Sequence, residues 1–440
     1  MGTRYVIVGN GAAGATAAVA IRRQDAAADI RVIGAENLPF YSRPGLAYLL
    51  TGMIPEKRLF ARPDSEYRRA DIRRTIGTVQ AIEPRSHRLD LADGEVVRYD
   101  RLLLAVGARA VRPSLPGSDL EGVVTLDNLA DARRILHLAR RARRACVVGG
   151  GITAIELAEG LAANGVETHY LMRGDRYWGS VLDPRESALV EERLTEDGIQ
   201  IHRGEELAQV HGHKGRVTAV ETQSGASLDC QVLAVAIGTA PRLELAQSAG
   251  LATGRGIWAN PDFATSDPDI FVAGDAAEVL DPTTGKRGID SLWSVAIEQG
   301  RAAAANMSGT GQPYRRPAPF NVTRIGGVTT TLIGAVGSGG REGDLVTLAR
   351  GDSHAWREQL DAFAVISDAG ANHLRLMLGE DRIVGAVVMG DQTLSRPLQH
   401  LIRDRVDIRA IRDRLIGRPS DVGHALAALM EKRAASVGAV

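Results

Sequence analysis

Continuous apolar runs of strand length recur along the first two thirds of the chain, and most of them lead into a glycine or a turn. The clearest runs are residues 4–8, 30–34, 102–106, 166–172 and 232–237. Runs that are apolar at successive positions are typical of parallel strands buried on both faces. Helical stretches lie between them, one beginning near Gly14 and an arginine-rich one from Asp131 to Arg144. This alternation predicts an α/β fold with Rossmann-like, three-layer domains, and we expect segment 87–106 to form antiparallel strands.

From about Pro317 the pattern changes to short strands joined by turns. The expected strands are residues 321–325, 362–366, 373–378 and 383–389, with a turn at Gly379–Asp381. Two polar-faced helices are predicted to follow, at roughly 394–415 and 420–435. Strands followed by helices indicate a separate α+β domain at the C-terminus.

Two glycine-rich turns, 140 residues apart, each join an apolar strand to a helix. The first, Gly9–Gly14, has the spacing Gly-x-Gly-x-x-Gly, and the second, Gly149–Ala154, repeats it with alanine in the third place. Small residues let the backbone turn tightly and approach a pyrophosphate, which then lies on the N-terminus of the following helix. Two copies predict two dinucleotides bound by one chain; the alternative is two purely structural turns.

An acidic residue follows a third apolar strand, Ile270–Gly274, at the position Asp275. In a doubly wound sheet, ligands bind at the carboxyl ends of the strands, so this carboxylate is placed to accept hydrogen bonds from polyol hydroxyls. The alternative is a helix N-cap.

Composition limits the classes of function. The chain has 440 residues, of which 44% are hydrophobic, and 53 basic residues balance 53 acidic ones, so nothing in it indicates binding to nucleic acid or a membrane surface. Its apolar runs are shorter than the roughly 20 residues of a membrane helix, and no signal peptide is apparent. The two cysteines, Cys146 and Cys230, fit a reducing, cytoplasmic setting. No Cys/His cluster has metal-ligand spacing, so no metal site is expected.

Taken in order, the paired turns, the strand Leu103–Gly107, the strand Ala234–Gly238 and the Ile270–Asp275 motif resemble the pyridine nucleotide–disulfide oxidoreductase superfamily. The resemblance runs from about residue 4 to residue 312. It implies an FAD domain at 1–112 and 243–314, an inserted NAD(P) domain at 113–242, and a C-terminal interface domain at 315–440 that would carry any homodimer contact.

The resemblance also implies which residues hold the cofactors. For FAD they are Gly9, Gly11, Ala12, Ala13, Gly14, Glu36, Arg43, Pro44, Val79, Ala105, Gly107, Gly274, Asp275 and Trp293. For the nicotinamide nucleotide they are Gly149, Gly151, Ile152, Thr153, Ala154, Glu156, Arg173, Arg176 and Gly238. Glu36 is expected at the adenosine ribose, while Trp293 and Glu156 are expected near the nicotinamide. The alternative for Trp293 is a core aromatic.

Missing cysteines select a branch of the superfamily. Disulfide reductases need a thiolate beside the flavin, but the corresponding stretch, Phe40–Tyr48, contains none. The chain therefore resembles the ferredoxin and rubredoxin reductases and the flavoprotein part of NAD(P)H nitrite reductases. Many ferredoxin reductases have Leu-Ser-Lys where this chain reads Leu46–Tyr48, which favours the rubredoxin and nitrite reductase side.

The coenzyme depends on the end of strand 166–172. An NAD site usually has an acid there for the ribose 2′-hydroxyl, whereas this strand ends in Met172 and is followed by Arg173 and Arg176. These arginines predict a contact to a 2′-phosphate and favour NADPH over NADH. The alternative is that both arginines are solvated and NADH is used.

These observations predict an FAD-dependent NAD(P)H oxidoreductase that passes electrons to a small redox protein or a partner reductase. The alternatives are an NAD(P)H oxidase or quinone reductase, and a flavoprotein that senses NADH through partner binding. A run of basic residues is a candidate docking surface for an acidic carrier, or simply a solvated face. Its members are Arg133, Arg134, Arg140, Arg141, Arg143 and Arg144.

Overall fold

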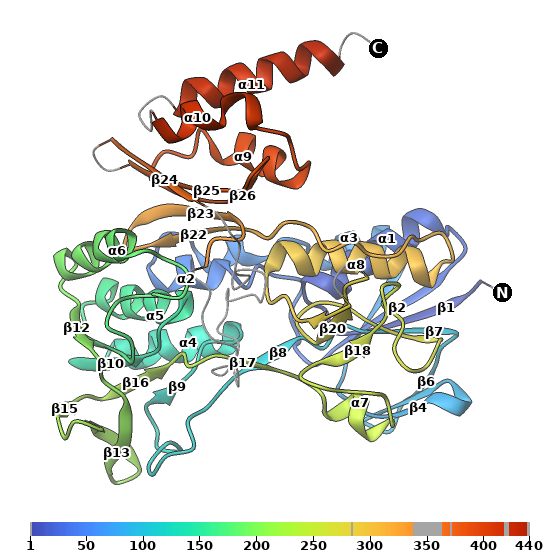
Figure 1. The fold of residues 1–440 in the computed structure, drawn as a ribbon. Coiled ribbons are helices and arrows are strands. Elements are labelled where there is room, and N and C mark those ends of the chain that lie inside the picture. The colour runs from blue at the N-terminus through green and yellow to red at the C-terminus, as the bar shows by residue number, and fades with distance from the viewer. Residues whose placement is uncertain (1, 283–284, 338–362, 370–371, 418–421, 438–440) are drawn as a thin grey trace.

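Two parallel sheets and one antiparallel sheet form the framework of the molecule (Figure 1). The computed structural model describes residues 2–282, 285–337, 363–369, 372–417 and 422–437. Within them, no helix combines the length and the apolar character needed to cross a membrane. The predicted α/β fold class, with two Rossmann-like units and a C-terminal α+β part, is confirmed.

The first sheet has the order β19-β7-β1-β2-β3, and all its neighbouring strands are parallel. Its strands are β1 (Arg4–Val8), β2 (Asp29–Gly34), β3 (Ile72–Ile76), β7 (Arg101–Leu104) and β19 (Ile270–Val272). Two long helices pack against each other beside it, α1 (Ala12–Gln24) and α8 (Trp293–Met307). An antiparallel meander adjoins the sheet, formed by β4 (Val79–Glu83), β5 (Arg88–Leu91) and β6 (Val96–Arg98).

The expectation of antiparallel strands across segment 87–106 was wrong at its end. β5 and β6 are antiparallel, but β7 joins the main sheet in parallel with β1 and β19. Its residues Leu102–Leu104 are fully buried, because both faces of this central strand are covered.

The second sheet has the order β12-β11-β10-β16-β9 and is likewise parallel. Its strands are β9 (Val123–Val124), β10 (Arg144–Val148), β11 (Glu167–Met172), β12 (Gln200–Arg203) and β16 (Val232–Val235). The accompanying helices are α4 (Leu129–Ala139), α5 (Ile152–Ala163) and α6 (Pro184–Glu196). A second meander consists of β13 (Leu207–His213), β14 (Arg216–Thr222) and β15 (Ser227–Asp229).

The predicted arginine-rich helix is shorter than expected. α4 ends at Ala139, a turn follows, and Arg144 already begins strand β10. Arg133 and Arg144 are also engaged, the first with Glu56 at 2.5 Å and the second with Glu167 at 3.0 Å. The continuous basic helical face that we expected from 131 to 144 is therefore not formed.

The two parallel units are connected by two strands that pair with each other. β8 (Ala108–Ala110) leaves the first unit, β17 (Thr239–Pro241) returns to it, and the two are antiparallel. Shorter elements complete the first unit and its surroundings. They are α2 (Gly45–Leu50), η1 (Glu56–Leu59), α3 (Asp64–Arg69), η2 (Pro84–Ser86), α7 (Glu244–Ser248), β18 (Ile257–Ala259), β20 (Ala277–Leu280) and β21 (Arg287–Gly288).

The third sheet is antiparallel, with the order β22-β23-β26-β25-β24. Its strands are β22 (Phe320–Ile325), β23 (Val328–Gly334), β24 (Phe363–Ala369), β25 (Asn372–Leu378) and β26 (Ile383–Met389). The helices α9 (Ser395–Arg403), α10 (Arg409–Gly417) and α11 (Val422–Val437) cover the face turned away from the parallel units (Figure 1).

The four predicted C-terminal strands are present, except that Ala362 is outside the described residues, but the sequence did not predict β23, the strand between β22 and β26. The single helix expected at 394–415 was wrong. The chain leaves the helix after Arg403, turns through Arg405 at φ +49°, and starts α10 at Arg409. Residues 420 and 421 of the second expected helix lie outside the described ranges.

Candidate cofactor site

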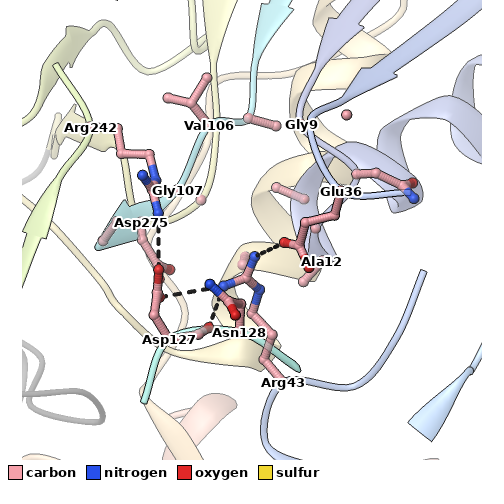
Figure 2. A pocket seen from close by; sticks show the side chains of 18 of the residues that line it. Gly9, Ala12, Glu36, Arg43, Val106, Gly107, Asp127, Asn128, Arg242 and Asp275 are labelled. Carbon is pink, nitrogen blue, oxygen red and sulfur yellow. Dashed lines mark hydrogen bonds and ion pairs between the residues drawn. The ribbon is translucent and has the colours of Figure 1, made fainter. Parts of the chain in front are cut away.

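A cavity of about 820 Å³ opens at the carboxyl ends of β1, β2 and β7 (Figure 2). Its volume lies within the roughly 300–1,000 Å³ that ligand sites usually occupy. The walls come from all three parts of the chain: the first unit, the start of α5 in the second unit, and residues 321–323 of β22.

The first glycine turn forms one end of this cavity. Gly9 has φ +112°, and a Cβ on it would lie 2.1 Å from the carbonyl oxygen of Ala105, so only glycine fits. Gly11 faces open space, and as the N-cap of α1 it offers no side chain to the helix amides. The N-terminus of α1 is therefore open to an anionic ligand.

The second turn repeats this backbone arrangement. Gly149 has φ +152°, and its Cβ would lie 2.3 Å from the carbonyl oxygen of Ala236. Ile152, Thr153 and Glu156, all from the first turns of α5, line the same cavity. The Thr153 hydroxyl is buried and has no hydrogen-bond partner among the described residues. A ligand reaching α5 from the cavity would find this hydroxyl available.

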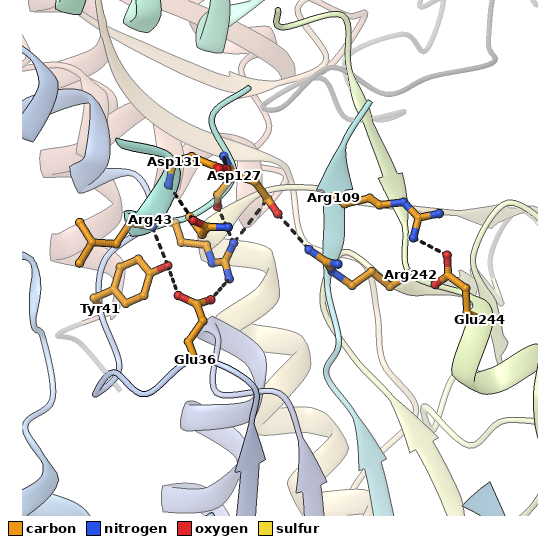
Figure 3. Close-up of polar contacts among 10 residues, drawn as sticks. Glu36, Tyr41, Arg43, Arg109, Asp127, Asp131, Arg242 and Glu244 are labelled. Atoms are coloured by element: carbon orange, nitrogen blue, oxygen red, sulfur yellow. Dashed lines mark hydrogen bonds and ion pairs between the residues drawn. The ribbon is translucent and has the colours of Figure 1, made fainter. Parts of the chain in front are cut away.

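A network of charged and polar groups forms the opposite wall (Figure 3). Arg43 donates from Nη2 to Glu36 Oε1 at 3.1 Å and from Nη1 to the carbonyl oxygen of Asp127 at 2.5 Å. The Tyr41 hydroxyl donates to Glu36 Oε2 at 2.8 Å. Arg242 donates from Nη2 to Asp127 Oδ2 at 2.9 Å. Residues from three separate segments are thus joined by charge-assisted hydrogen bonds.

The surroundings shift the pKa values of two groups of this network, Tyr41 and Arg43. It raises the pKa of Tyr41 to about 12, with the nearby Arg43 acting in the opposite direction. Burial alone would lower the pKa of Arg43, but Tyr41 and the carboxylates of Asp127, Glu36 and Asp275 raise it overall. Arg43 is therefore a permanent cation, which together with Arg242 faces the carboxylates of Glu36 and Asp127 in this wall.

Trp293 begins α8 and lines the cavity. Its ring stacks on Phe40, with centroids 5.6 Å apart and an interplanar angle of 16°. Trp293 is only partly buried against the core of the first unit, so it is both a packing residue and a wall of the cavity.

Most residues predicted for FAD lie around this cavity. They are Gly9, Gly11, Ala12, Ala13, Glu36, Arg43, Pro44, Val79, Ala105, Gly107, Gly274, Asp275 and Trp293. Gly14 lies behind them, where its Cβ would meet the carbonyl oxygen of Gly9 at 2.0 Å. Of the residues predicted for the nicotinamide nucleotide, only Ile152, Thr153 and Glu156 line it. The others, Gly149, Gly151, Ala154, Arg173, Arg176 and Gly238, lie outside its lining.

Arg173 and Arg176 follow the end of β11, as expected. Arg173 is exposed, whereas Arg176 is half-buried and donates from Nη2 to the carbonyl oxygen of Gly179 at 3.2 Å. Met172 is 1% exposed and packs in the core of the second unit. A side chain at this position thus faces the core in the structure, which the sequence could not indicate.

Several lining residues were missed by the sequence argument. Asp127 and Arg242 follow no nucleotide motif, and residues 321–323 come from the C-terminal part. One signal was present: Asn128 and Asp131 have the spacing of a helix start, and Asn128 Oδ1 accepts from the amide of Asp131 at 2.9 Å. That signal locates the start of α4 but not its position beside the cavity.

Both cysteines lie away from the cavity. Cys146 and Cys230 are fully buried in a cluster between the second sheet and its meander. Hydrogen bonding with Cys230 and burial raise the pKa of the Cys146 thiol. A thiol held protonated in this way is a poor nucleophile.

One group of acids and histidine lies close enough for a metal in the described part of the chain: Asp183, Glu186 and His373. Arg375 already occupies it, because Nε donates to Glu186 Oε1 at 2.9 Å and Nη2 to Glu186 Oε2 at 3.0 Å. The cluster is a buried ion pair between α6 and β25.

A protein-family model described as pyridine nucleotide-disulphide oxidoreductase matches residues 3–300. The ferredoxin–NAD(+) reductase component of the biphenyl dioxygenase system of Paraburkholderia xenovorans is 32% identical over 352 residues, covering 79% of this chain and 84% of that protein. Among solved structures, a ferredoxin reductase from Rhodopseudomonas palustris superposes with a TM-score of 0.84 at 24% identity, over 96% of this chain and 100% of that one.

An engineered water-forming NADPH oxidase bound to NADPH also shares the fold. Its TM-score is 0.79 at 22% identity, and the match covers 92% of this chain and 91% of that one.

Proposed function

Since the chain belongs to the pyridine nucleotide–disulphide oxidoreductase family, we propose that it passes electrons from a nicotinamide nucleotide through bound FAD to a small redox protein of the ferredoxin or rubredoxin type. The observation that carries this proposal is the single cavity that joins the first glycine turn, Asp275 and the N-terminus of α5. Two dinucleotide devices then meet at one site, as hydride transfer between two cofactors requires.

The cavity fits FAD in three respects. Gly9 and Gly11 leave room at the N-terminus of α1 for a pyrophosphate. Glu36, two residues beyond β2, and Asp275, beyond β19, both line it with carboxylates that accept hydrogen bonds from ribose or polyol hydroxyls. FAD bound there would accept a hydride and pass its two electrons on one at a time.

The chain's own residues bind and orient in this scheme. Pro44, Trp293 and Ala296 present apolar surface in the wall of the cavity. Thr153 and Glu156 approach from α5 and are proposed to position the nicotinamide. The two thiols are buried elsewhere, which supports an acceptor that needs no protein dithiol. An NAD(P)H oxidase or quinone reductase, or a flavoprotein sensing NADH through a partner, are the alternatives.

We propose NADPH as the preferred coenzyme. The engineered NADPH oxidase differs from an NADH oxidase by five substitutions, among them a glycine-to-alanine change and, eighteen residues later, an aspartate-to-alanine change followed directly by an alanine-to-arginine change. This chain has Ala154 and, eighteen residues later, Met172 followed directly by Arg173. The relative from Paraburkholderia is a ferredoxin–NAD(+) reductase component, so NADH is the alternative.

We further propose domain limits of 1–112 with 243–314, 113–242 and 315–440, and a cytoplasmic location. The chain passes between the two parallel units beside β8 and β17, and these strands pair with each other. This pairing supports the first two limits.

The test uses purified protein reconstituted with FAD. A yellow protein that reduces ferricyanide with NADPH or NADH, and reduces an added ferredoxin or rubredoxin, is the expected result. A protein that takes up no FAD contradicts the proposal. Rapid oxygen consumption without any carrier favours the oxidase, and flavin reduction with negligible turnover favours the sensor.

A further inference from the structure

One carboxylate, that of Asp127, connects the three chain segments that meet at the junction of the parallel units (Figure 3). Asp127 precedes α4 in the second unit, Arg43 precedes α2 in the first unit, and Arg242 directly follows the returning strand β17. Arg43 Nη1 lies 3.4 Å from Asp127 Oδ1, and Arg242 Nη2 lies 2.9 Å from Oδ2. Each carboxylate oxygen therefore faces a different guanidinium group.

The rest of Asp127 is held equally firmly. Its carbonyl oxygen accepts from Arg43 Nη1 at 2.5 Å, and its amide donates to Asp131 Oδ2 at 2.9 Å. The side chain of Asp127 is 13% exposed and that of Arg43 is 29% exposed. Because water is largely excluded, these ion pairs are screened less than surface pairs are.

The contacts of Asp127 bear on both units at once. Arg43 also binds Glu36 at 3.1 Å, so the bridge continues from Asp127 to the carboxylate at the end of β2. Arg242 lines the cavity from the strand by which the chain returns to the first unit. A change at the Asp127 carboxylate would therefore remove the Oδ2 contact of Arg242 and the Oδ1 contact of Arg43, while Arg43 keeps its bonds to Glu36 and to the Asp127 carbonyl oxygen.

We infer that Asp127 is a positioning residue. It holds the second unit against the first so that the nicotinamide lies at reacting distance from the flavin. This inference rests on the proposed function. Hydride transfer requires reacting atoms about 3–3.5 Å apart, and a misplacement of about 1 Å costs up to 100-fold in rate. β8 and β17 cross between the units at this point, and α2 of the first unit packs against α4 and α5 of the second in a shared apolar core, so the Asp127 bridge fixes the geometry at the edge of that contact, beside the cavity.

The same bridge sets the charge around the flavin. Replacing Asp127 by asparagine removes a negative charge from the cavity wall, which favours the reduced, more negative flavin and makes its midpoint potential more positive. Replacing Arg242 by glutamine removes a positive charge and makes the potential more negative. Arg242 is 40% exposed, so its shift should be the smaller of the two.

The experiment compares Asp127→Asn, Arg242→Gln and the double variant, all reconstituted with FAD. Stopped-flow reduction of the flavin by saturating NADPH or NADH should slow by about 10- to 100-fold in Asp127→Asn. In the double variant, flavin reduction should slow by less than the product of the two single effects, because both substitutions break the same bridge. Flavin potentials should shift in opposite directions in the two single variants.

Arg109→Gln is the matched control. Arg109 lies on β8, the strand paired with β17, and pairs with Glu244, but it is half exposed and lies outside the cavity lining. Its variant should keep the wild-type reduction rate and potential. The inference is overturned if Asp127→Asn and Arg242→Gln reduce flavin at the control's rate, or if their potentials do not move in opposite directions. A wild type that binds no FAD would instead contradict the proposed function.

Discussion

The two glycine turns have the same backbone arrangement but differ at two positions that help to select a nucleotide in dinucleotide-binding folds. These are the end of the following strand and the third small residue of the turn. Gly9 and Gly149 both have positive φ, and a Cβ on either would lie within 2.3 Å of a carbonyl oxygen on the neighbouring strand. In the first unit an acid, Glu36, stands two residues beyond β2 and lines the cavity. In the second unit β11 ends in a buried Met172, and an exposed arginine follows.

The third position of the turns differs as well. Gly14 has no room for a Cβ, whereas Ala154 occupies the corresponding place in the second turn. Under the proposed function, the shared backbone arrangement would bind a pyrophosphate, and the residues around it would determine which dinucleotide is bound.

Gly14→Ala should have the largest effect, because it breaks the first turn alone. Its Cβ would lie 2.0 Å from the Gly9 carbonyl oxygen and 3.1 Å from Ile7 Cγ2. Backbone must move, at a cost of about 3 kcal/mol, and flavin occupancy should fall with it. Thermal unfolding and the flavin absorbance per protein measure both effects.

The reverse substitution, Ala154→Gly, is the control for that variant. It should cost only about 1 kcal/mol, the usual helix penalty for glycine. Equal losses in the two variants would mean that the turns are equivalent and that the comparison fails.

Asp275→Ala is expected to weaken FAD binding by about 10- to 100-fold, since a carboxylate that bonds polyol hydroxyls contributes about 1.5–3 kcal/mol. Affinity for the nicotinamide nucleotide should change little. Flavin release on dilution, followed by fluorescence, measures the first, and titration with coenzyme measures the second. Unchanged flavin retention would leave Asp275 with a structural role only.

The turns and the acids beside them could be predicted because their requirements are local. A glycine with positive φ, such as Gly9, and an acid at a strand end, such as Asp275, are visible in a few consecutive residues. Asp127 could not be predicted, because its partner Arg43 lies 84 residues away and their pairing exists only after the units dock.

Two fold predictions failed for similar reasons. β7 looked like the last strand of a meander, but its partners β1 and β19 are remote in sequence, so its parallel pairing is a property of the whole sheet. The break between α9 and α10 falls at Arg405, which takes a left-handed conformation without a glycine or proline to announce it. Tertiary packing determined both features.

Arg173→Ala tests the difference between the strand ends. If Arg173 meets a 2′-phosphate, its loss should reduce the kcat/KM ratio of NADPH over NADH by about five- to fiftyfold. The wild-type preference should also shrink as salt rises, because Arg173 is exposed. Met172→Glu is unsuitable as the first test, since the structure buries that side chain.

Arg140→Ala is the control for Arg173→Ala, as an exposed arginine at the end of α4. It should leave the coenzyme ratio unchanged. A wild type that prefers NADH would show that Arg173 points to solvent and that the missing acid at Met172 has no bearing on selectivity.

Glu159 marks a difference in packing between α5 of the second unit and α1 of the first. On α5 it accepts from the amide of Gly327 at 3.0 Å, and burial raises its pKa to about 7, whereas the corresponding residue of α1 is Val19. Because the folded pKa exceeds the ordinary 4.5, this group's contribution to stability is fully present below about pH 4.5. It is lost as pH rises through 7 and amounts to about 1–3 kcal/mol, with partial exposure reducing it.

Glu159→Gln should remove this pH dependence. The free energy of unfolding, measured by urea titration at pH 5 and pH 8, should fall less with rising pH in the variant than in the wild type. Identical slopes would mean that Glu159 keeps an ordinary pKa at the contact between α5 and the turn from β22 to β23.

The smallest effect is expected from replacing the two thiols, Cys146 and Cys230. Cys146 marks a difference between β1 and β10, the first strands of the two glycine turns, that we expect to have no consequence for the chemistry. Cys146 in β10 corresponds to Val6 in β1, and both are buried at the same point of their sheets. Replacing both cysteines by alanine should cost about 1 kcal/mol per site through lost burial. Turnover with ferricyanide should stay within about twofold of the wild type, because both thiols lie outside the cavity lining and a loss of unfolding free energy leaves the activation free energy of the folded protein unchanged. Reductive titration of the wild type should stop at two electrons per flavin. An uptake of four would reveal a redox disulfide, which would make the second unit a partner in the chemistry instead of a holder of coenzyme.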